Sequence, residues 1–418
     1  MFGFWSSRRI YMDHAATTLL DGRVLSVMKK VFSRHYFNPG ALYREGVATD
    51  QLIDQSRVSV AKLLGTTSDH VIFTRGGTES CNMAILGTLS TIVERVDSAR
   101  NPGEDRVRTI PHVITSAIEH AAVLETLKDL EKNKKIELSI IPVNNEGIII
   151  VDEIKKALRP ETVLVTVMYV NNEIGTIQPI KEIVKLVRWY KKQHSLTKYP
   201  LVHTDAIQAV NYLDMHVERL GVDLVSLSGS KIYGPKSSGV LYVRHKELMG
   251  SMFFGGDQEF GFRAGTEDVA QVIGFTKALE ITRAAADSEK VRLEVLRDIF
   301  VDELKNTVEG IIVNGSLHER NANNINVTVP GISGERLVIE LDAQGICAAS
   351  KSACKEDDGE ASHVIAAIRK EGDSLSVTDG AVRFTMGRTT TKRDVVTTVK
   401  VLKEIVDRIR IFEQTLTK

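Results

Sequence analysis

The sequence is poor in cysteine and has no excess of charge of either sign. Only 3 of its 418 residues are cysteines. Three cysteines are too few, and uneven in number, for a disulfide framework. They favour a reducing compartment. Lysine and arginine together number 54, as do aspartate and glutamate. This balance argues against a dedicated nucleic-acid-binding protein, which usually carries a basic surface.

Long apolar runs are also missing. No stretch approaches the roughly 18 apolar residues that a membrane-spanning helix needs. The apolar stretch at residues 1–5 is too short for the core of a signal peptide, and the basic pair follows it instead of preceding it. We therefore expect no membrane contact and a cytoplasmic location.

What is present is an alternation of short apolar runs with helical stretches. This pattern predicts an α/β fold, with a mostly parallel sheet and helices on both of its faces. The predicted strands are 71–74, 112–116, 162–170, 201–206, 222–228 and 238–244. The last two are joined too tightly for a helical crossover, so one antiparallel pairing is expected.

The alternation of predicted strands and helices ends at about residue 270. Residues 272–308 read as a long amphipathic helix, and the segments after it predict a smaller α+β unit that closes with a helix at about 391–416. A chain of this length is expected to hold two or three domains.

A glycine-rich turn joins the first of these strands to a helix. In TRGGTES, two glycines end the strand and Thr78 opens the helix. A helix N-terminus offers free N–H groups and a partial positive charge, which suit a phosphate group. The turn therefore predicts a phosphate site at Gly77 and Thr78. The alternative is a plain strand–helix turn capped by Thr78, without a ligand.

Asp205 and Lys231 each follow a buried strand, the place where open α/β sheets bind ligands. A carboxylate at Asp205 can pair with a protonated ring nitrogen, and Gln208 lies three residues further on. Lys231 lies among small residues, with Ser228 and Ser230 before it, and a desolvated lysine there can act as a Schiff-base amine. The alternatives are a helix cap for Asp205 and an exposed turn residue for Lys231.

Three further residues are candidates for chemistry. His120 follows a strand and opens a helix, where an imidazole can stack on a ring or move a proton. Cys354 lies in a polar loop between Lys351 and Lys355, unlike a structural cysteine. Arg383 lies in an apolar strand and needs a partner, such as a substrate carboxylate. The alternatives are a capping histidine, a surface thiol and a structural salt bridge.

The order of these segments resembles a known family. They are YMDHAATT, FNPGALYREG, VIFTRGGTESCNMAILG, EHAAVLETL, VNNEIGTIQPI, HTDAIQAV, SLSGSKIYGPKSSGVLYVR, FRAGTEDV, SKSAC, SHVIAAI and VRFTMGR. In this order they resemble the cysteine desulfurases of the class V aminotransferase group, which are pyridoxal phosphate (PLP) enzymes of fold type I. The resemblance implies a large PLP-binding domain at 15–270 and a small domain made of 1–14 and 271–418.

The resemblance also implies roles for single residues. Lys231 matches the Schiff-base lysine, Asp205 the partner of the ring nitrogen, and His120 the residue stacked on the ring. Asn171 and Gln208 match contacts to the ring hydroxyl. The phosphate contacts match Gly77, Thr78, Ser228, Ser230 and, reaching the neighbouring subunit of a homodimer, Thr266.

The substrate side of the site follows from the same resemblance. Asn38, Asn171 and Arg383 match substrate contacts, with Arg383 on the α-carboxylate, and Cys354 matches the cysteine that takes the sulfur. The implied reaction converts L-cysteine to L-alanine and passes sulfur to an acceptor protein for iron–sulfur cluster assembly or tRNA thiolation. No metal is expected.

The chain departs from the family pattern at two places. Ser230 stands where the family often has histidine, and KSACKED carries more charge than the usual cysteine loop. A serine hydroxyl still donates to a phosphate. Three other functions remain open at this point. A selenocysteine lyase would share all of these residues, another class V enzyme such as an aminotransferase would not need Cys354, and a scaffold protein would need none of them.

Overall fold

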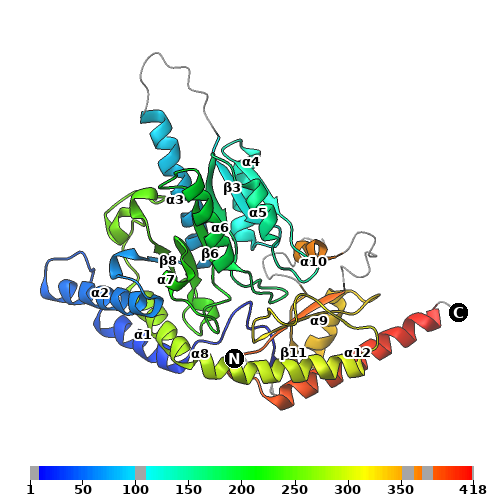
Figure 1. The fold of residues 1–418 in the computed structure, drawn as a ribbon. Helices are drawn as coiled ribbons and strands as arrows, with labels where there is room; N and C mark the ends of the chain where they lie inside the picture. Colours follow the sequence, from blue (N-terminus) through cyan, green and yellow to red (C-terminus); the bar gives the residue numbers. More distant parts are fainter. Residues whose placement is uncertain (1–8, 99–109, 351–361, 370–379, 417–418) are drawn as a thin grey trace.

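A seven-stranded sheet forms the centre of the larger part of the molecule (Figure 1). The computed structural model describes residues 9–98, 110–350, 362–369 and 380–416. In spatial order the strands are β2 (Val71–Thr74), β8 (Gly239–Val243), β7 (Leu224–Ser228), β6 (Leu201–Asp205), β5 (Thr162–Thr166), β3 (His112–Ser116) and β4 (Glu137–Ile141).

The sheet is parallel except at β8. This strand runs antiparallel to β7, as its short connection predicts, and also antiparallel to β2. The second pairing was not predicted, because β2 lies far from β8 in the sequence. The connection from β7 to β8 carries Lys231, so this reversal of direction brings the lysine to the end of the sheet where β6 also ends.

Helices cover both faces of the sheet. Side chains alternate across it: Phe73 joins one core cluster and Ile72 the other. This alternation follows from the pleat, which turns successive side chains to opposite faces. The helices of this part of the chain are α1 (Gly22–Arg34), α2 (Arg44–Leu64), α3 (Gly77–Ser98), α4 (Ala121–Lys132), α5 (Val151–Ala157), α6 (Ile180–Gln193) and α7 (Val217–Leu220).

One long helix links this region to a smaller α+β unit (Figure 1). It is α8 (Val269–Thr307), close to the predicted 272–308. Its first half contributes Phe275 to the core beside α1 and α2, and its second half contributes Phe300 to a separate core cluster with α12. The smaller unit holds β1 (Ile10–Tyr11), β9 (Ile312–Val313), β10 (Asn324–Thr328), α9 (Gly334–Ala343), β11 (Ile346–Cys347), β12 (Ala381–Thr385) and α12 (Lys392–Leu416). The short helix α10 (His363–Ile368) instead packs its buried side chains into the core of the larger part.

The α/β fold with a mostly parallel, helix-flanked sheet is therefore confirmed. The domain boundaries at 14–15 and 270–271 stay a prediction, although Met12 does pack in the core cluster of the smaller unit. Within the residues that the structure describes, no helix is both long and apolar enough to span a bilayer. The same residues contain no cluster of three or more metal-binding side chains.

Candidate active site

A cavity of about 400 Å³ opens where β6 and β7 end and α3 begins. Its volume lies in the range of ordinary small-molecule sites. Most of the predicted site residues line it: Gly77, Thr78, His120, Asp205, Gln208, Ser228, Ser230, Lys231 and Arg383. Residues that are up to roughly 300 positions apart in the chain thus meet at one place, at the carboxyl ends of parallel strands.

The glycine turn is shaped for close approach to an anion. Gly76 has φ +135°, a conformation that side chains rarely allow, and a Cβ on Gly77 would lie 2.2 Å from Ile207 Cδ1. Helix α3 begins at Gly77, so its free N–H groups lie at the cavity. The Ser228 and Ser230 hydroxyl oxygens, 3.1 Å apart, line the same cavity. These donors suit a phosphate group.

Asp205 is a buried carboxyl group at the end of β6. It is 5 % exposed, and its Oδ1 accepts a hydrogen bond of 2.9 Å from Ile207 N. The residues after it form turns, so it caps a turn and not a helix. Burial raises the pKa of Asp205 to about 6, and the nearby Lys231 charge opposes this rise. A cation in the cavity would stabilise the carboxylate, as a protonated ring nitrogen does.

Lys231 is held by the N-terminal segment of the chain and is not a free turn lysine. It ends the short 3₁₀ turn η2 (Gly229–Lys231), and its Nζ donates to the carbonyl oxygen of Ala16. The backbone N and Oγ1 of Thr18 both donate to Ser230 O at 2.9 Å. The segment around YMDHAATT therefore closes one wall of the cavity and fixes the lysine backbone.

His120 both caps a helix and lines the cavity. Its Nδ1 accepts a hydrogen bond of 3.1 Å from Ala122 N at the start of α4. In the neutral ring the proton must then be on Nε2. His120 is thus the capping histidine that the sequence offered as an alternative, and this hydrogen bond fixes the tautomer of an imidazole that borders the cavity.

Arg383 is buried in β12, only 2 % exposed, and lines the cavity. One Nη donates to Asp13 Oδ1 at 2.7 Å and the other to Asn172 O at 3.1 Å. The structural salt bridge that the sequence left open therefore exists. Within the described part of the chain, the Arg383 Nε is buried and has no hydrogen-bond partner. This donor remains for an acceptor such as a carboxylate.

Of the predicted residues that the structure describes, three do not line the cavity. Asn171 is buried beside it, but its Oδ1 accepts from Glu173 N and Ile174 N, and its Nδ2 donates to Ile118 O. The exposed Asn38 closes its own turn by accepting from Gly40 N. Thr266 is exposed, in the segment that leads to α8. Cys354 lies outside the described residues. The roles assigned to these four stay predictions.

The sequence analysis missed several lining residues. Ala15, Ala16 and Thr17 border the cavity, as do Asn172 and Arg75. The first three lie in a quoted motif, yet two alanines and a threonine give no specific indication of a ligand site. Arg75 could have been predicted, since a basic residue beside a glycine turn favours an anion site.

Glu119, next to His120, is a second buried carboxyl group. It is fully buried, and its Oε1 accepts from Ser116 Oγ at 2.6 Å and Met168 N at 2.9 Å. Its Oε2 has no hydrogen-bond partner among the described residues. Burial raises the pKa of Glu119 to about 8, and the neighbouring Asp205 adds to the rise.

We expect Glu119→Gln to flatten the pH dependence of stability. The folded-state pKa lies above the ordinary 4.5, so the Glu119 contribution is complete below pH 4.5 and is lost as pH rises to about 8. Each pKa unit corresponds to about 1.4 kcal/mol. The free energy of unfolding of the cofactor-free protein, measured from pH 4.5 to 8, should shift progressively in favour of the variant. Parallel curves for the two proteins would contradict this.

These groups fit pyridoxal phosphate. The glycine turn would hold the phosphate, Asp205 the ring nitrogen and Lys231 the aldehyde carbon. A Cβ on Gly77 would collide with the Ile207 side chain, so the turn needs glycine there. The fit rests on the donors and acceptors that line the cavity.

Comparisons with known proteins lead to the same site chemistry. The family model "Aminotransferase class-V" matches residues 10–397. A "Cysteine desulfurase IscS" of Dictyoglomus turgidum is 39 % identical over 403 residues, 96 % of each chain. Another, from Methanosarcina thermophila, is 37 % identical and covers 97 % of this chain and 93 % of its own.

Solved structures agree with the sequence relatives. A "NifS-like protein" aligns with a TM-score of 0.84 at 31 % identity, covering 96 % of this chain and 100 % of its own. "SspA in complex with cysteine" aligns with a TM-score of 0.74 at 30 % identity, covering 90 % and 98 %. The chain therefore belongs to the class V aminotransferase family and, within it, to the pyridoxal-phosphate-dependent cysteine desulfurases.

Proposed function

We propose that this enzyme takes the sulfur of L-cysteine, releases L-alanine and holds the sulfur as a persulfide on Cys354. The observation that carries the proposal is the cavity itself, where a buried carboxyl group (Asp205), an amine (Lys231) and a guanidinium with a spare donor (Arg383) meet. A 30 % identical structure is described as being in complex with cysteine, which supports the choice of substrate.

Each side chain has a defined task in this scheme. Pyridoxal phosphate supplies an electron sink next to the substrate Cα. Lys231 Nζ takes the Cα proton, and Asp205 keeps the ring nitrogen protonated. Arg383 binds the α-carboxylate through Nε, and His120 moves a proton at Nε2. Substrate groups thus meet donors whose directions are already set by the fold.

Sulfur transfer balances without a further reactant. The Cys354 thiolate forms a bond to the substrate sulfur as the Cβ–S bond breaks. The electron pair of that bond stays on carbon, which gains a proton, so alanine leaves and sulfur remains on Cys354. A thiol of the acceptor protein then takes the sulfur, for iron–sulfur cluster assembly or tRNA thiolation.

We expect Cys354→Ala to abolish protein-bound persulfide during turnover with L-cysteine. The matched control is Cys347→Ala, since Cys347 is half-buried in β11 and does not line the cavity. Mass spectrometry of alkylated peptides should find an added sulfur on the Cys354 peptide of the wild type and of the control. Persulfide on the Cys354→Ala protein would contradict the assignment.

A homodimer is part of the proposal. Exposed apolar side chains lie on α1, between α1 and α2, and on the loop before the 3₁₀ turn η4 (Gln258–Gly261): Leu25, Phe32, Tyr36, Leu42, Tyr43 and Phe254. A second copy that covers them would bury this surface. Thr266, which does not line the cavity of its own chain, would then reach the cofactor phosphate of the partner. We also propose a cytoplasmic location, which the sparse cysteines support.

A further inference from the structure

A buried ion pair holds the segment that leads to Thr266. Arg57 of α2 and Glu259 of η4 lie with side chains only 9 % and 3 % exposed. Arg57 donates twice to the Glu259 carboxylate, at 2.6 Å from Nη1 and 2.9 Å from Nη2. Such a bidentate pair fixes orientation as well as distance, because both groups are planar.

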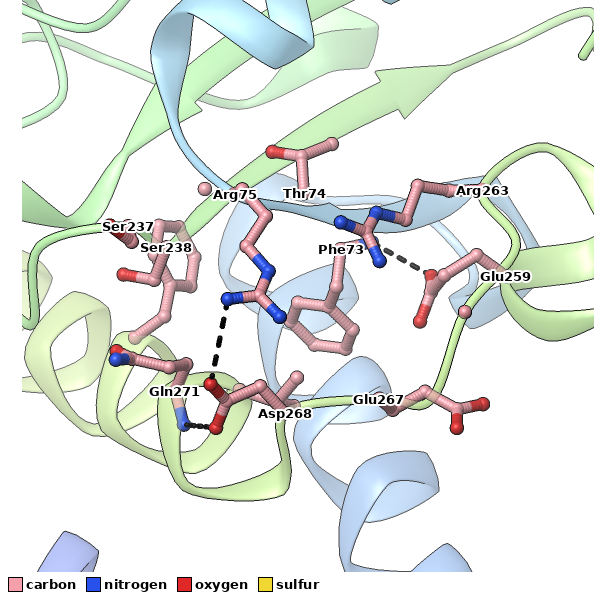
Figure 2. A pocket seen from close by; sticks show the side chains of 14 residues that line it. Phe73, Thr74, Arg75, Ser237, Ser238, Glu259, Arg263, Glu267, Asp268 and Gln271 are labelled. Atoms are coloured by element: carbon pink, nitrogen blue, oxygen red, sulfur yellow. Dashed lines mark hydrogen bonds and ion pairs between the residues drawn. The ribbon is translucent and has the colours of Figure 1, made fainter. Parts of the chain in front are cut away.

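The pair is anchored to the edge strand of the sheet. Glu259 Oε2 accepts a hydrogen bond of 2.8 Å from Phe73 N (Figure 2), and Arg57 Nη1 donates to Val71 O at 2.7 Å. The Arg57 guanidinium lies 5.0 Å from the centre of the Phe73 ring and 4.9 Å from that of Phe260. The contacts of Glu259 therefore tie its loop to β2 and α2 at once.

The backbone of this loop is strained where the pair holds it. Glu259 has φ 49° and Phe260 φ 59°, and neither is glycine. Two successive residues in the left-handed region persist only where the surroundings impose the conformation. Here the buried hydrogen bonds of Glu259 impose it, and the half-exposed Phe260 ring adds its contact with the Arg57 guanidinium.

The segment is fixed again on both sides of Thr266. Arg263 Nε lies 3.0 Å from Glu79 Oε1. On the other side, Asp268 faces Arg75 at 3.9 Å, as Figure 2 shows. Arg75 and Glu79 belong to the phosphate turn of the same chain. Thr266 itself is exposed, so its side chain is presented outward by a segment that is held at both ends.

We propose that the Arg57–Glu259 pair positions Thr266 for the cofactor phosphate of the partner subunit. Glu259 is thus a positioning residue for a site on the other chain of the dimer. This inference rests on the proposed homodimer. It predicts that damage to the pair weakens cofactor binding in the partner more than in its own chain, where the pair reaches the phosphate turn only through the backbone of β2.

Mixed dimers test this directly. Two differently tagged chains are co-expressed, one of them carrying Lys231→Ala so that only the other can bind pyridoxal phosphate covalently. Glu259→Gln is placed on the Lys231→Ala chain in one dimer and on the intact chain in the other. The readout is the apparent dissociation constant for added pyridoxal phosphate, from the visible absorbance of the lysine-bound group.

We expect the dissociation constant to rise roughly tenfold, the size of one lost hydrogen bond to a charged group, when Glu259→Gln lies on the Lys231→Ala chain, and by a clearly smaller factor when it lies on the intact chain. Thr266→Ala should give the same pattern. A loss confined to the intact chain, an equal loss in both arrangements, no loss in either, or a monomeric protein would overturn the inference. Arg57→Lys, in the same two arrangements, replaces Glu259→Gln if that variant does not fold.

Failure of the inference can be told apart from failure of the proposed function. Release of sulfide from L-cysteine by the wild-type dimer tests the function, whereas the absorbance titration needs no turnover. A wild type that desulfurates cysteine, with mixed dimers that show no difference between arrangements, would leave the function standing and reject the positioning role of Glu259.

Discussion

Lys231→Ala is expected to abolish desulfuration and the visible absorbance of the bound cofactor. Lys231 lines the cavity together with Asp205, and its Nζ donates to Ala16 O, whereas the second lysine of the lining, Lys236, lies beyond the end of the 3₁₀ turn. Without its amine the chain has neither the covalent attachment point nor the base for the Cα proton. General acid–base catalysis alone contributes about 10²–10⁴-fold, so the turnover number should fall by at least about a thousandfold.

Two further variants separate the amine from its charge. Lys231→Arg keeps a cation that can donate to Ala16 O, yet it lacks a primary amine and should be as inactive as Lys231→Ala. Lys128→Ala removes an exposed lysine of α4 that pairs with Glu125, and it should keep wild-type activity and absorbance. A Lys231→Ala protein that retains the visible absorbance would show that another residue binds the cofactor.

Asp205→Asn is expected to lower the turnover number by about 10²–10³-fold, the size of one lost electrostatic contact to developing charge. Asparagine keeps the acceptor for Ile207 N, so the turn after β6 should persist. It lacks the negative charge that favours a protonated ring nitrogen, and the electron sink weakens. Steady-state kinetics should show the loss mainly in the turnover number and less in KM.

The matched control is Asp223→Asn. Asp223 also accepts a backbone hydrogen bond, from Val202 N at 2.8 Å, and it does not line the cavity. Its variant should keep activity within about twofold, because asparagine keeps the acceptor for Val202 N and the side chain lies outside the cavity. Equal losses in both variants would mean that Asp205 acts through stability and not through the cofactor.

Much of the central sheet could be predicted because its strands are buried on both faces. Val71–Thr74 and His112–Ser116 have the predicted bounds. The run at 162–170 is shorter as a strand and ends at Thr166, since the chain there turns toward the cavity through Met168. The pairing of β2 with β8 depends on contacts between distant parts of the chain, which local patterns do not contain.

Site residues could be predicted where a polar side chain follows a buried strand. Asp205 and Lys231 stand out because polar groups at the ends of buried strands need a partner, and both line the cavity. Arg383 also needed a partner, but its ion pair with Asp13 joins residues 370 positions apart and follows from the tertiary fold alone. For Asn171 the sequence indicated a ligand contact, but in the fold its side-chain oxygen accepts hydrogen bonds from backbone N–H groups of its own loop.

The most direct test of the account is a visible spectrum of the purified protein, followed by addition of L-cysteine and a thiol reductant with assays for sulfide and alanine. The account predicts a yellow protein that releases sulfide and alanine in equal amounts. A yellow protein that releases no sulfide would contradict the proposed reaction and direct attention to selenocysteine or another amino acid. A colourless protein that pyridoxal phosphate does not restore would contradict the cofactor site itself.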